Sequence, residues 1–393
     1  MISRREFCQR ATLISLAPTI PGFLTHMAQA ASPTLDDRIL VIIQLSGGND
    51  GLNTVVPYND DDYRRLRPKL AIAKDRVHRL NDTVGLHPAM KAAHELFTEG
   101  RLAIVQGVGY PNPNKSHDVS MSIWQTARLD PEEHRSYGWI GRALDELPPS
   151  TADQAASILV GKETPPMALR GRHSIAASFS DSNELNMVDV PSRIMSPANG
   201  NDLSTYLRRN TLQTMITAER LRQMAKTSRS ETKPPDSELA NRLALIAQLI
   251  KCDFGARVYY VVQSGYDTHA LQLSSHERLL RDLSRGLKFF LDELKRAKLD
   301  DRVLVMAFSE FGRPLEENAS EGTDHGTAGP VFLAGSNLRA GLHGTTPRLD
   351  ALSDGDLPVT ADFRQVYQQV LNKWLKLPSL ASLNGEFPNL EIL

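Results

Sequence analysis

Apolar residues occur in five nearly continuous runs, which predict strands. The runs are residues 38–45, 102–108, 256–262, 302–308 and 329–334. A strand covered on both faces has this pattern, whereas a half-exposed strand alternates apolar and polar side chains. Two shorter segments, 156–160 and 167–169, predict additional short strands.

Between these runs, apolar residues recur at helical spacing. The longest case is 277–296, where seven apolar side chains form one stripe: Leu279, Leu280, Leu283, Leu287, Phe290, Leu291 and Leu294. Other helices are predicted at 87–99, 120–127, 203–224, 237–250 and 362–375, and the polar segment 226–236 is predicted to be an exposed loop. Alternating apolar strands and amphipathic helices predict an α/β fold with a largely parallel central sheet and helices on both faces.

Clusters of Asp, His and Glu follow several of the predicted strands. In sheets of this class, ligands bind beyond the carboxyl ends of the strands, which meet at one edge. The mixture of carboxylates and imidazoles suits a divalent metal ion. We therefore expect the following side chains to converge at that edge: Asp50, Asp267, His269, Ser309 and Glu310.

The first cluster, Gly47-Gly48-Asn49-Asp50-Gly51, allows two interpretations. Gly, Asn and Asp all suit a tight turn. Alternatively, Asp50 is an oxygen ligand, and the glycines let the backbone approach a metal ion or an anion. The segment is not a nucleotide-binding loop, because it has neither GxGxxG nor a GK[ST] ending.

Two later pairs combine a carboxylate with an imidazole. Asp267 and His269 are two residues apart, so in an extended segment they face the same side and can bind one cation or neighbouring cations. The alternative is a capping Asp followed by a surface His. Asp324 and His325 lie in a Gly/Thr-rich loop, where they can bind two metals, or one metal and a substrate oxygen, or serve only as loop residues.

Glu310 comes directly after a buried strand. A carboxylate without a partner is costly there. We therefore expect Glu310 to meet a cation, which is either a metal ion or Arg313.

Ser116 stands between the strand 102–108 and the next helix, at a predicted helix N-terminus. Backbone N–H groups and the helix dipole favour an anion at such a position. Ser116 is either an N-cap only, or a nucleophile or substrate-anion contact. In both cases Lys115 and His117 beside it favour a negatively charged substrate.

The first thirty residues have the features of a twin-arginine signal peptide. Ser3-Arg4-Arg5-Glu6-Phe7 precedes a modestly apolar stretch, and Ala28-Gln29-Ala30 fits a cleavage site. The alternative is an amphipathic helix that stays attached. Pro18 and Pro21 interrupt the short apolar stretch, so no stable membrane span is expected. Export by the twin-arginine (Tat) translocase predicts a periplasmic or secreted location.

Composition limits the remaining possibilities. The net charge of −1 provides no electrostatic attraction for nucleic acid or an anionic membrane. Cys8 lies in the predicted signal, so Cys252 has no partner for an internal disulfide. Residues 36–393 are expected to form a single α/β domain with a helical insertion near 203–250.

Several motifs in this order resemble a known family, over nearly the whole predicted mature chain. They are the twin-arginine signal, SGGNDGLN, SHDVSMSIWQT, YDTHA, FSEFGR and TDHGTAGPVFLAG. Together they resemble the family called domain of unknown function 1501 (DUF1501). That family is similar in fold to the alkaline phosphatase superfamily, which includes sulfatases and cofactor-independent phosphoglycerate mutases. The resemblance therefore implies an alkaline phosphatase-like α/β fold.

The resemblance also implies roles for single residues. Asp50 matches a metal-binding Asp after the first strand, and Ser116 matches the nucleophile at a helix start. Asp267 and His269 match a later metal-binding pair, spaced D-x-H here and usually D-x-x-x-H in the superfamily. His325 matches the final His before a strand.

One position departs from the superfamily. The strand 302–308 is followed by Ser309-Glu310 where an Asp-His pair is expected. Glu310 can replace the acidic ligand, but an imidazole is missing there. Asp324 is the candidate to compensate for it.

Two functions are consistent with these residues. The first is an exported metal-dependent hydrolase of phosphate or sulfate esters, acting on a small anionic ester or polymer. Ser116 would attack, and Lys115 or His117 would stabilise the oxyanion. The expected ligands of the divalent metal, Zn²⁺ or Mn²⁺, are Asp50, Asp267, His269, Glu310, Asp324 and His325. The second function is a non-catalytic exported binding protein on the same scaffold, with a degenerate metal site.

Overall fold

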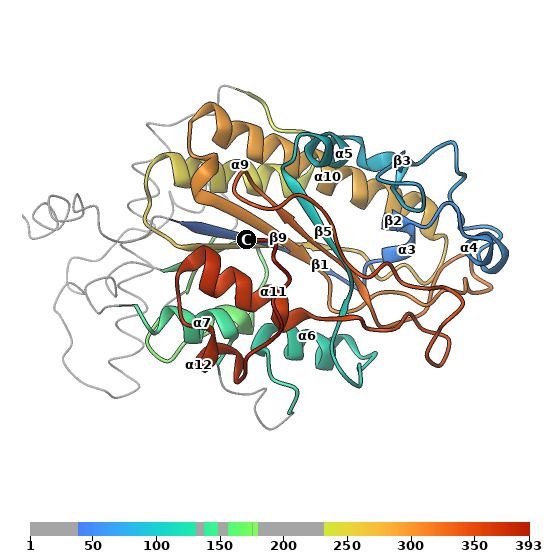
Figure 1. The fold of residues 1–393 in the computed structure, drawn as a ribbon. Coiled ribbons are helices and arrows are strands. Elements are labelled where there is room, and N and C mark those ends of the chain that lie inside the picture. The colour runs from blue at the N-terminus through green and yellow to red at the C-terminus, as the bar shows by residue number, and fades with distance from the viewer. Residues whose placement is uncertain (1–37, 131–136, 148–155, 175, 180–231) are drawn as a thin grey trace, which may run out of the picture. The chain divides into compact units, whose positions relative to one another are not determined.

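A mostly parallel sheet forms the centre of the protein, which confirms the predicted fold class (Figure 1). The structure is a computed structural model that describes residues 38–130, 137–147, 156–174, 176–179 and 232–393. The strand order is β11-β5-β10-β9-β1-β8-β6-β7, and β12 pairs with β5. The bounds are β1 Ile39–Ser46, β5 Leu102–Gly109, β6 Ser157–Val160, β7 Ala176–Phe179, β8 Val258–Ser264, β9 Val303–Phe308, β10 Gly329–Ala334, β11 Gly341–Gly344 and β12 Ala361–Asp362.

The central strand β1 shows why these apolar runs form strands. It pairs in parallel with β8 on one side and β9 on the other. Val41 and Ile43 belong to the core on one face of the sheet, whereas Leu40 and Ile42 belong to the core on the other. All four are completely buried, because helices cover both faces.

Two layers of helices cover the sheet (Figure 1). One face is covered by α5 Lys91–Thr98, α9 Glu238–Lys251 and α10 Gln272–Arg296, with the 3-10 turn η2 Pro88–Met90 before α5. The other is covered by α6 His117–Thr126, α7 Trp139–Leu144, α11 Phe363–Gln369, the π-helical turn η9 Val370–Leu375 and α12 Ser379–Leu383. The predicted apolar stripe of α10 is buried in full, from Leu279 to Leu294.

The strand β10 runs antiparallel to both of its neighbours, β5 and β9. The other pairs in this sheet are parallel within the described part of the chain. The start of β10 therefore lies at the same edge as the ends of β1, β5, β8 and β9. For this reason the loop that precedes β10 reaches the edge where the candidate site residues were expected.

A small second sheet was not predicted from the sequence. Its strands are β2 Val55–Val56, β3 His78–Arg79 and β4 Gly85–Leu86, in the order β2-β4-β3. The short helices α3 Gly51–Thr54 and α4 Asp61–Leu66 accompany it. Strands of two residues carry too little periodicity to be recognised in a sequence.

One short predicted strand is a helical turn in the structure, and some predicted segments lie outside the described residues. The segment 167–169 is the 3-10 turn η5 Met167–Leu169, not a strand, and it follows Pro165 and Pro166, which cannot donate ladder hydrogen bonds. Another 3-10 turn, η8 Asp300–Arg302, precedes β9. The segments 1–30 and 203–224 lie outside the described residues, as does most of the loop 226–236. Helix α9, placed in the predicted insertion, packs on the sheet with α10.

Within the described ranges, no helix is both long and apolar enough to cross a membrane.

Candidate metal centre

Three imidazoles meet around one oxygen atom of Asp267 at the carboxyl edge of the sheet. Oδ1 of Asp267 lies 2.9 Å from Nε2 of His269 and 3.3 Å from Nε2 of His325. Nε2 of His117 lies 3.5 Å from the same oxygen. His117, Asp267 and His325 each offer a ligand atom within 4.8 Å of the others. The three imidazoles come from α6, from the segment after β8 and from the loop before β10.

The second ring nitrogen of each histidine faces an acceptor. Nδ1 of His117 lies 2.8 Å from Oε1 of Glu310. Nδ1 of His325 lies 2.7 Å from the carbonyl oxygen of Lys115. Nδ1 of His269 lies 3.4 Å from Oδ1 of Asp324. With the proton on Nδ1, each Nε2 presents its lone pair toward Asp267, as in histidines that bind metals.

Two contacts in this cluster are ones that a divalent metal ion would satisfy. Nε2 of His117 is buried and has no hydrogen-bond partner. Nε2 of His269 and Nε2 of His325 face each other at 2.9 Å, and in the tautomers with the proton on Nδ1 neither nitrogen has a hydrogen to donate. Two ligand atoms on one tetrahedral Zn²⁺ lie about 3.3 Å apart, given bond lengths of about 2.0–2.1 Å. The donor set of imidazoles and one carboxylate suits Zn²⁺.

Neighbouring charges and hydrogen bonds shift the pKa values of groups in the cluster. Burial alone would raise the pKa of Asp267, but the hydrogen bond and charge of Arg313 lower it below the usual value. The hydrogen bond from Asn318 lowers the pKa of Asp324, and that from His269 adds to it. The hydrogen bond to Glu310 raises the pKa of His117, against the effect of burial. Asp267 is thus kept as the carboxylate, the form that binds metals.

Arg313 holds together the loops that carry the site. Its buried guanidinium donates to the carbonyl oxygens of Gly47, Gly48 and Thr323, and to Oδ1 of Asp267 at 2.8 Å. Gly47 has a φ of +120°, and a Cβ there would lie 2.4 Å from the backbone nitrogen of Asp267. Only glycine allows the loop after β1 to pass so close to the Asp267 segment.

A phenylalanine packs against two of the imidazoles. The ring centroid of Phe311 lies 4.9 Å from that of His117 and 4.8 Å from that of His325. The rings of His117 and His325 are 4.4 Å apart and edge-on to each other. This apolar contact restricts the rotation of both histidines, so their Nε2 atoms are held in place without a metal ion.

The structure does not bring Asp50 into this cluster. Its carboxylate is completely buried and caps α3, accepting from the backbone nitrogens of Leu52 and Asn53. Nη1 of Arg67 lies 2.7 Å from Oδ2, and Gln272 donates to the same oxygen. Burial alone would raise the pKa of Asp50, but Arg67 and other donors lower it. Asp50 is the anionic centre of a buried polar network.

Glu310 lies on the far side of the His117 ring from Asp267. Its Oε1 accepts from the backbone nitrogen of Gly47 at 2.9 Å and from Nδ1 of His117. Ser309 donates to the carbonyl oxygen of Leu45 and lies 3.1 Å from Oε2 of Glu310. Arg313, one of the two cations expected for Glu310, pairs with Asp267. The partner of Glu310 is instead the imidazole of His117.

Ser116 and Lys115 precede His117 at the start of α6. Ser116 is the exposed N-cap residue, and its hydroxyl makes no capping hydrogen bond. The ammonium of Lys115 lies 2.6 Å from Oδ2 of Asp356, so it points to that loop and is already paired. His117 was predicted to contact an oxyanion; the structure places its Nε2 with the candidate ligands. In the sequence, the only feature that pointed to His117 was its position beside Ser116, at the start of a predicted helix.

The polar network around Asp50 contains a histidine that is buried in its neutral form. Nε2 of His276 lies 2.9 Å from Oδ1 of Asn49, and the side chain is 1% exposed. Burial lowers the pKa of His276 from its ordinary value of 6.5 to about 3. In the unfolded chain this histidine takes up a proton near its ordinary pKa, whereas in the folded chain it does not.

His276 is therefore expected to make the protein less stable in acid. Because its folded pKa is depressed, its contribution is complete above pH 6.5 and is lost as the pH falls from about 6.5 toward 3, by about 1.4 kcal/mol per pH unit. Urea unfolding at pH 7.5 and 5.5 measures this loss. The His276→Gln variant should show a smaller difference between the two pH values, whereas His173→Gln, at an exposed position, should match the parent. Equal pH dependence in all three proteins would contradict the assignment.

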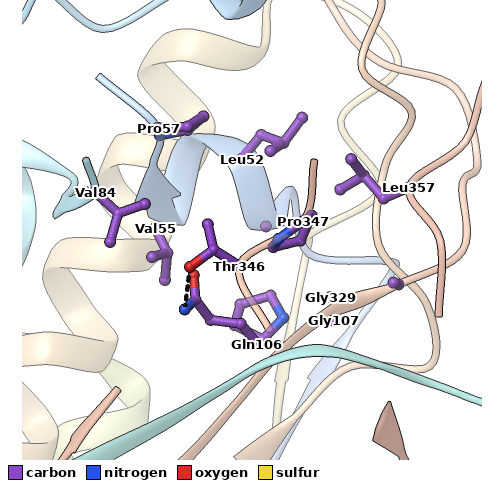
Figure 2. A pocket seen from close by; sticks show the side chains of 13 residues that line it. Leu52, Val55, Pro57, Val84, Gln106, Gly107, Gly329, Thr346, Pro347 and Leu357 are labelled. Atoms are coloured by element: carbon purple, nitrogen blue, oxygen red, sulfur yellow. Dashed lines mark hydrogen bonds between the residues drawn. The ribbon is translucent and has the colours of Figure 1, made fainter. Parts of the chain in front are cut away.

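A small pocket lies apart from the candidate metal ligands. It is bounded by α3, the end of β5, the start of β10 and the loop around Pro347 (Figure 2). Leu52, Val55 and Leu357 contribute apolar walls, and Nε2 of Gln106 donates to Thr346 at 3.0 Å. None of the predicted site residues lines it.

The fold and the cluster define an α/β protein with a candidate metal centre at the carboxyl edge of its sheet. The chain belongs to the family described as "Protein of unknown function (DUF1501)", whose model matches residues 37–379. No curated protein matches the chain.

Several solved structures resemble the chain distantly. A protein in the alkaline phosphatase superfamily from Vibrio parahaemolyticus is 10% identical, with a TM-score of 0.41 over 90% of this chain and 71% of the other. The PsFucS1 sulfatase from Pseudoalteromonas sp. is 9% identical, with a TM-score of 0.39 over 87% and 69%. The lipoteichoic acid synthase LtaP from Listeria monocytogenes is 12% identical, with a TM-score of 0.34 over 82% and 74%. Since these similarities are low, the functional proposal rests on the residues of this chain.

Proposed function

We propose that the protein is an exported, metal-dependent hydrolase of phosphate or sulfate esters, with Ser116 as its nucleophile. One observation carries the proposal: His117, Asp267 and His325 form a candidate metal group one residue from Ser116. Ser116 is exposed and stands at the N-terminus of the ten-residue helix α6. The N–H groups at that terminus favour the negative charge of a phosphate or sulfate group.

The chemistry needs a metal ion, for which His117, Asp267 and His325 are the proposed ligands and His269 a neighbour. A bound Zn²⁺ or Mn²⁺ supplies a Lewis acid that draws charge from the ester oxygens and lowers the pKa of a hydroxyl beside it. Glu310 and the carbonyl oxygen of Lys115 keep the rings of His117 and His325 in place. Asp324 does the same for His269.

The proposed reaction has two displacements. Oγ of Ser116 forms a bond to phosphorus or sulfur and loses its proton to water, while the bond to the ester oxygen breaks and the departing alkoxide takes a proton from water. A water molecule then cleaves the ester on Ser116, restoring its hydroxyl and releasing the inorganic anion. The N–H groups that open α6 stabilise the anion in both steps.

The test is hydrolysis of aryl phosphates, phosphodiesters and aryl sulfates by the zinc-loaded protein. The Ser116→Ala variant is expected to lose about 10³-fold or more in kcat while keeping its metal, as when other enzymes lose a nucleophile. The matched control is Ser122→Ala, further along the same helix, which should retain full activity. Hydrolysis that survives in Ser116→Ala would remove Ser116 from the mechanism.

A non-catalytic metal-binding role is the second candidate, and His269 favours it. Its Nε2 lies 2.9 Å from both Asp267 Oδ1 and His325 Nε2, where it can serve as a fourth protein ligand. Four protein ligands complete a tetrahedral site, as in structural zinc centres, whereas a catalytic site keeps one position open. Inorganic phosphate added to the Co²⁺-substituted protein separates the two roles. A change in the visible spectrum indicates an open position, and an unchanged spectrum supports the binding role.

We also infer export by the twin-arginine translocase. The inference rests on the Arg4-Arg5 pair, the apolar stretch after it and the cleavage site ending at Ala30. Replacement of both arginines by lysine should keep the protein in the cytoplasm, as cell fractionation would show. A periplasmic product from that variant would contradict this route.

A further inference from the structure

We infer that the carboxyl edge of the sheet, within the described residues, binds a single divalent metal ion, and that arginine side chains supply the other positive charges beside its carboxylates. The inference rests on the proposed metal site but not on ester hydrolysis. It follows from the partners of four acidic groups near the carboxyl edge: Asp50, Asp267, Glu310 and Asp324. Of these four, only Asp267 has an oxygen that faces Nε2 of His117, His269 and His325.

Asp50 already has a cation, which is Arg67. Both side chains are completely shielded from solvent, and Nη1 of Arg67 lies 2.7 Å from Oδ2 of Asp50. Arg67 also donates to the carbonyl oxygens of Pro314 and Leu315. A metal ion on Asp50 would displace this guanidinium and leave it buried without its counter-charge, which is strongly unfavourable.

The oxygens of Asp50 have no free direction for a metal ion. Oδ1 accepts from the backbone nitrogens of Leu52 at 3.1 Å and Asn53 at 3.3 Å. Oδ2 accepts from Gln272 in addition to Arg67. Four donors satisfy the four acceptor positions of one carboxylate. Asp50 therefore stabilises the start of α3 and the network behind the site.

Glu310 faces the wrong nitrogen of His117 to share its metal ion. It contacts Nδ1 at 2.8 Å, whereas Nε2 is the nitrogen directed at Asp267. The carboxylate is 1% exposed and is also fixed by the backbone nitrogen of Gly47. Asp324 likewise contacts Nδ1 of His269, whereas Nε2 of His269 faces Asp267. Glu310 and Asp324 are positioning residues for the imidazoles.

Arg313 provides the second positive charge beside Asp267. Its Nη2 lies 2.8 Å from Oδ1 of Asp267, and the side chain is shielded from solvent. The guanidinium also binds the carbonyl oxygens of Gly47 and Gly48, which follow β1. A fixed cation already links the loop after β1 to the metal-binding carboxylate. A second metal ion at this place would meet a like charge.

The experiment is a count of bound zinc in the protein purified from cells, stripped with chelator, saturated with Zn²⁺ and freed of excess ion. Elemental analysis is expected to find one zinc per chain, and calorimetric titration one binding step. Two ions per chain, or none, would overturn the inference. A protein that binds one zinc and hydrolyses no ester would refute the proposed function alone.

Three variants separate ligands from supporting residues. Glu310→Gln and Asp50→Asn should still bind one zinc at saturation, and Glu310→Gln should bind it about 10–100-fold more weakly, as for residues that orient a ligand. His325→Ala should lose the bound zinc. Less than one zinc in saturated, folded Glu310→Gln would make Glu310 a ligand and overturn the assignment. Circular dichroism checks folding, and if Asp50→Asn does not fold, the parent and Glu310→Gln decide the result.

Discussion

Asp267→Asn is expected to abolish metal binding and, with it, any hydrolysis that depends on the metal. Oδ1 of Asp267 faces Nε2 of His117, His269 and His325 together. An amide keeps the size of the side chain but removes the negative charge that offsets a divalent cation. We expect the zinc affinity to fall by more than the roughly 10–100-fold that is typical of residues behind the ligands.

The measurement is zinc affinity by competition with a chelating dye, with hydrolysis followed in parallel. Asp350→Asn is the matched control, since Asp350 is exposed and pairs only with Arg348 among the described contacts. The control should bind zinc like the parent. Parental zinc affinity in folded Asp267→Asn would show that this carboxylate is not a ligand.

Arg67→Met is expected to lower the free energy of unfolding more than any other substitution named above. The change removes the guanidinium that neutralises Asp50 in a place that solvent does not reach. Breaking a buried ion pair from one side typically costs about 3–5 kcal/mol, because the remaining charge stays buried. The metal-free protein should show this decrease in the free energy of unfolding in urea, so that bound zinc does not contribute.

The control for this variant is Arg348→Met, which breaks an exposed ion pair with Asp350. We expect its unfolding curve to overlay that of the parent, because solvent screens exposed pairs. If folded Arg67→Met still binds one zinc, the stability and metal-binding roles are separate. An Arg67→Met protein as stable as the parent would show that Asp50 does not need its partner.

The strands were predictable because the sheet is buried on both faces. Runs such as 38–45 and 302–308 are apolar at almost every position, so they can be recognised without knowledge of the fold. Helix α10 was predicted to begin at Glu277, but it begins five residues earlier, at Gln272. Its first turns carry the buried polar residues Gln272 and His276, whose partners come from distant segments.

The candidate site was predictable only in part. Asp267, His269 and His325 were expected at the edge, and the structure brings them together. Asp50 was expected with them, but the structure pairs it with Arg67, seventeen residues away in the sequence. The sequence contains no signal that distinguishes a carboxylate paired with an arginine from one free for a metal ion.

The sequence by itself determined the α/β class, the edge of the sheet where the polar clusters lie, and most of the residues found there. Apolar runs and strand ends are local features, so they can be recognised from neighbouring residues. Only the tertiary structure decided which nitrogen of each histidine faces Asp267, and that Arg67 and Arg313 neutralise carboxylates near the site. Those choices depend on the relative orientation of β1, β8, β9 and the antiparallel β10, because their loops meet only after the sheet has formed.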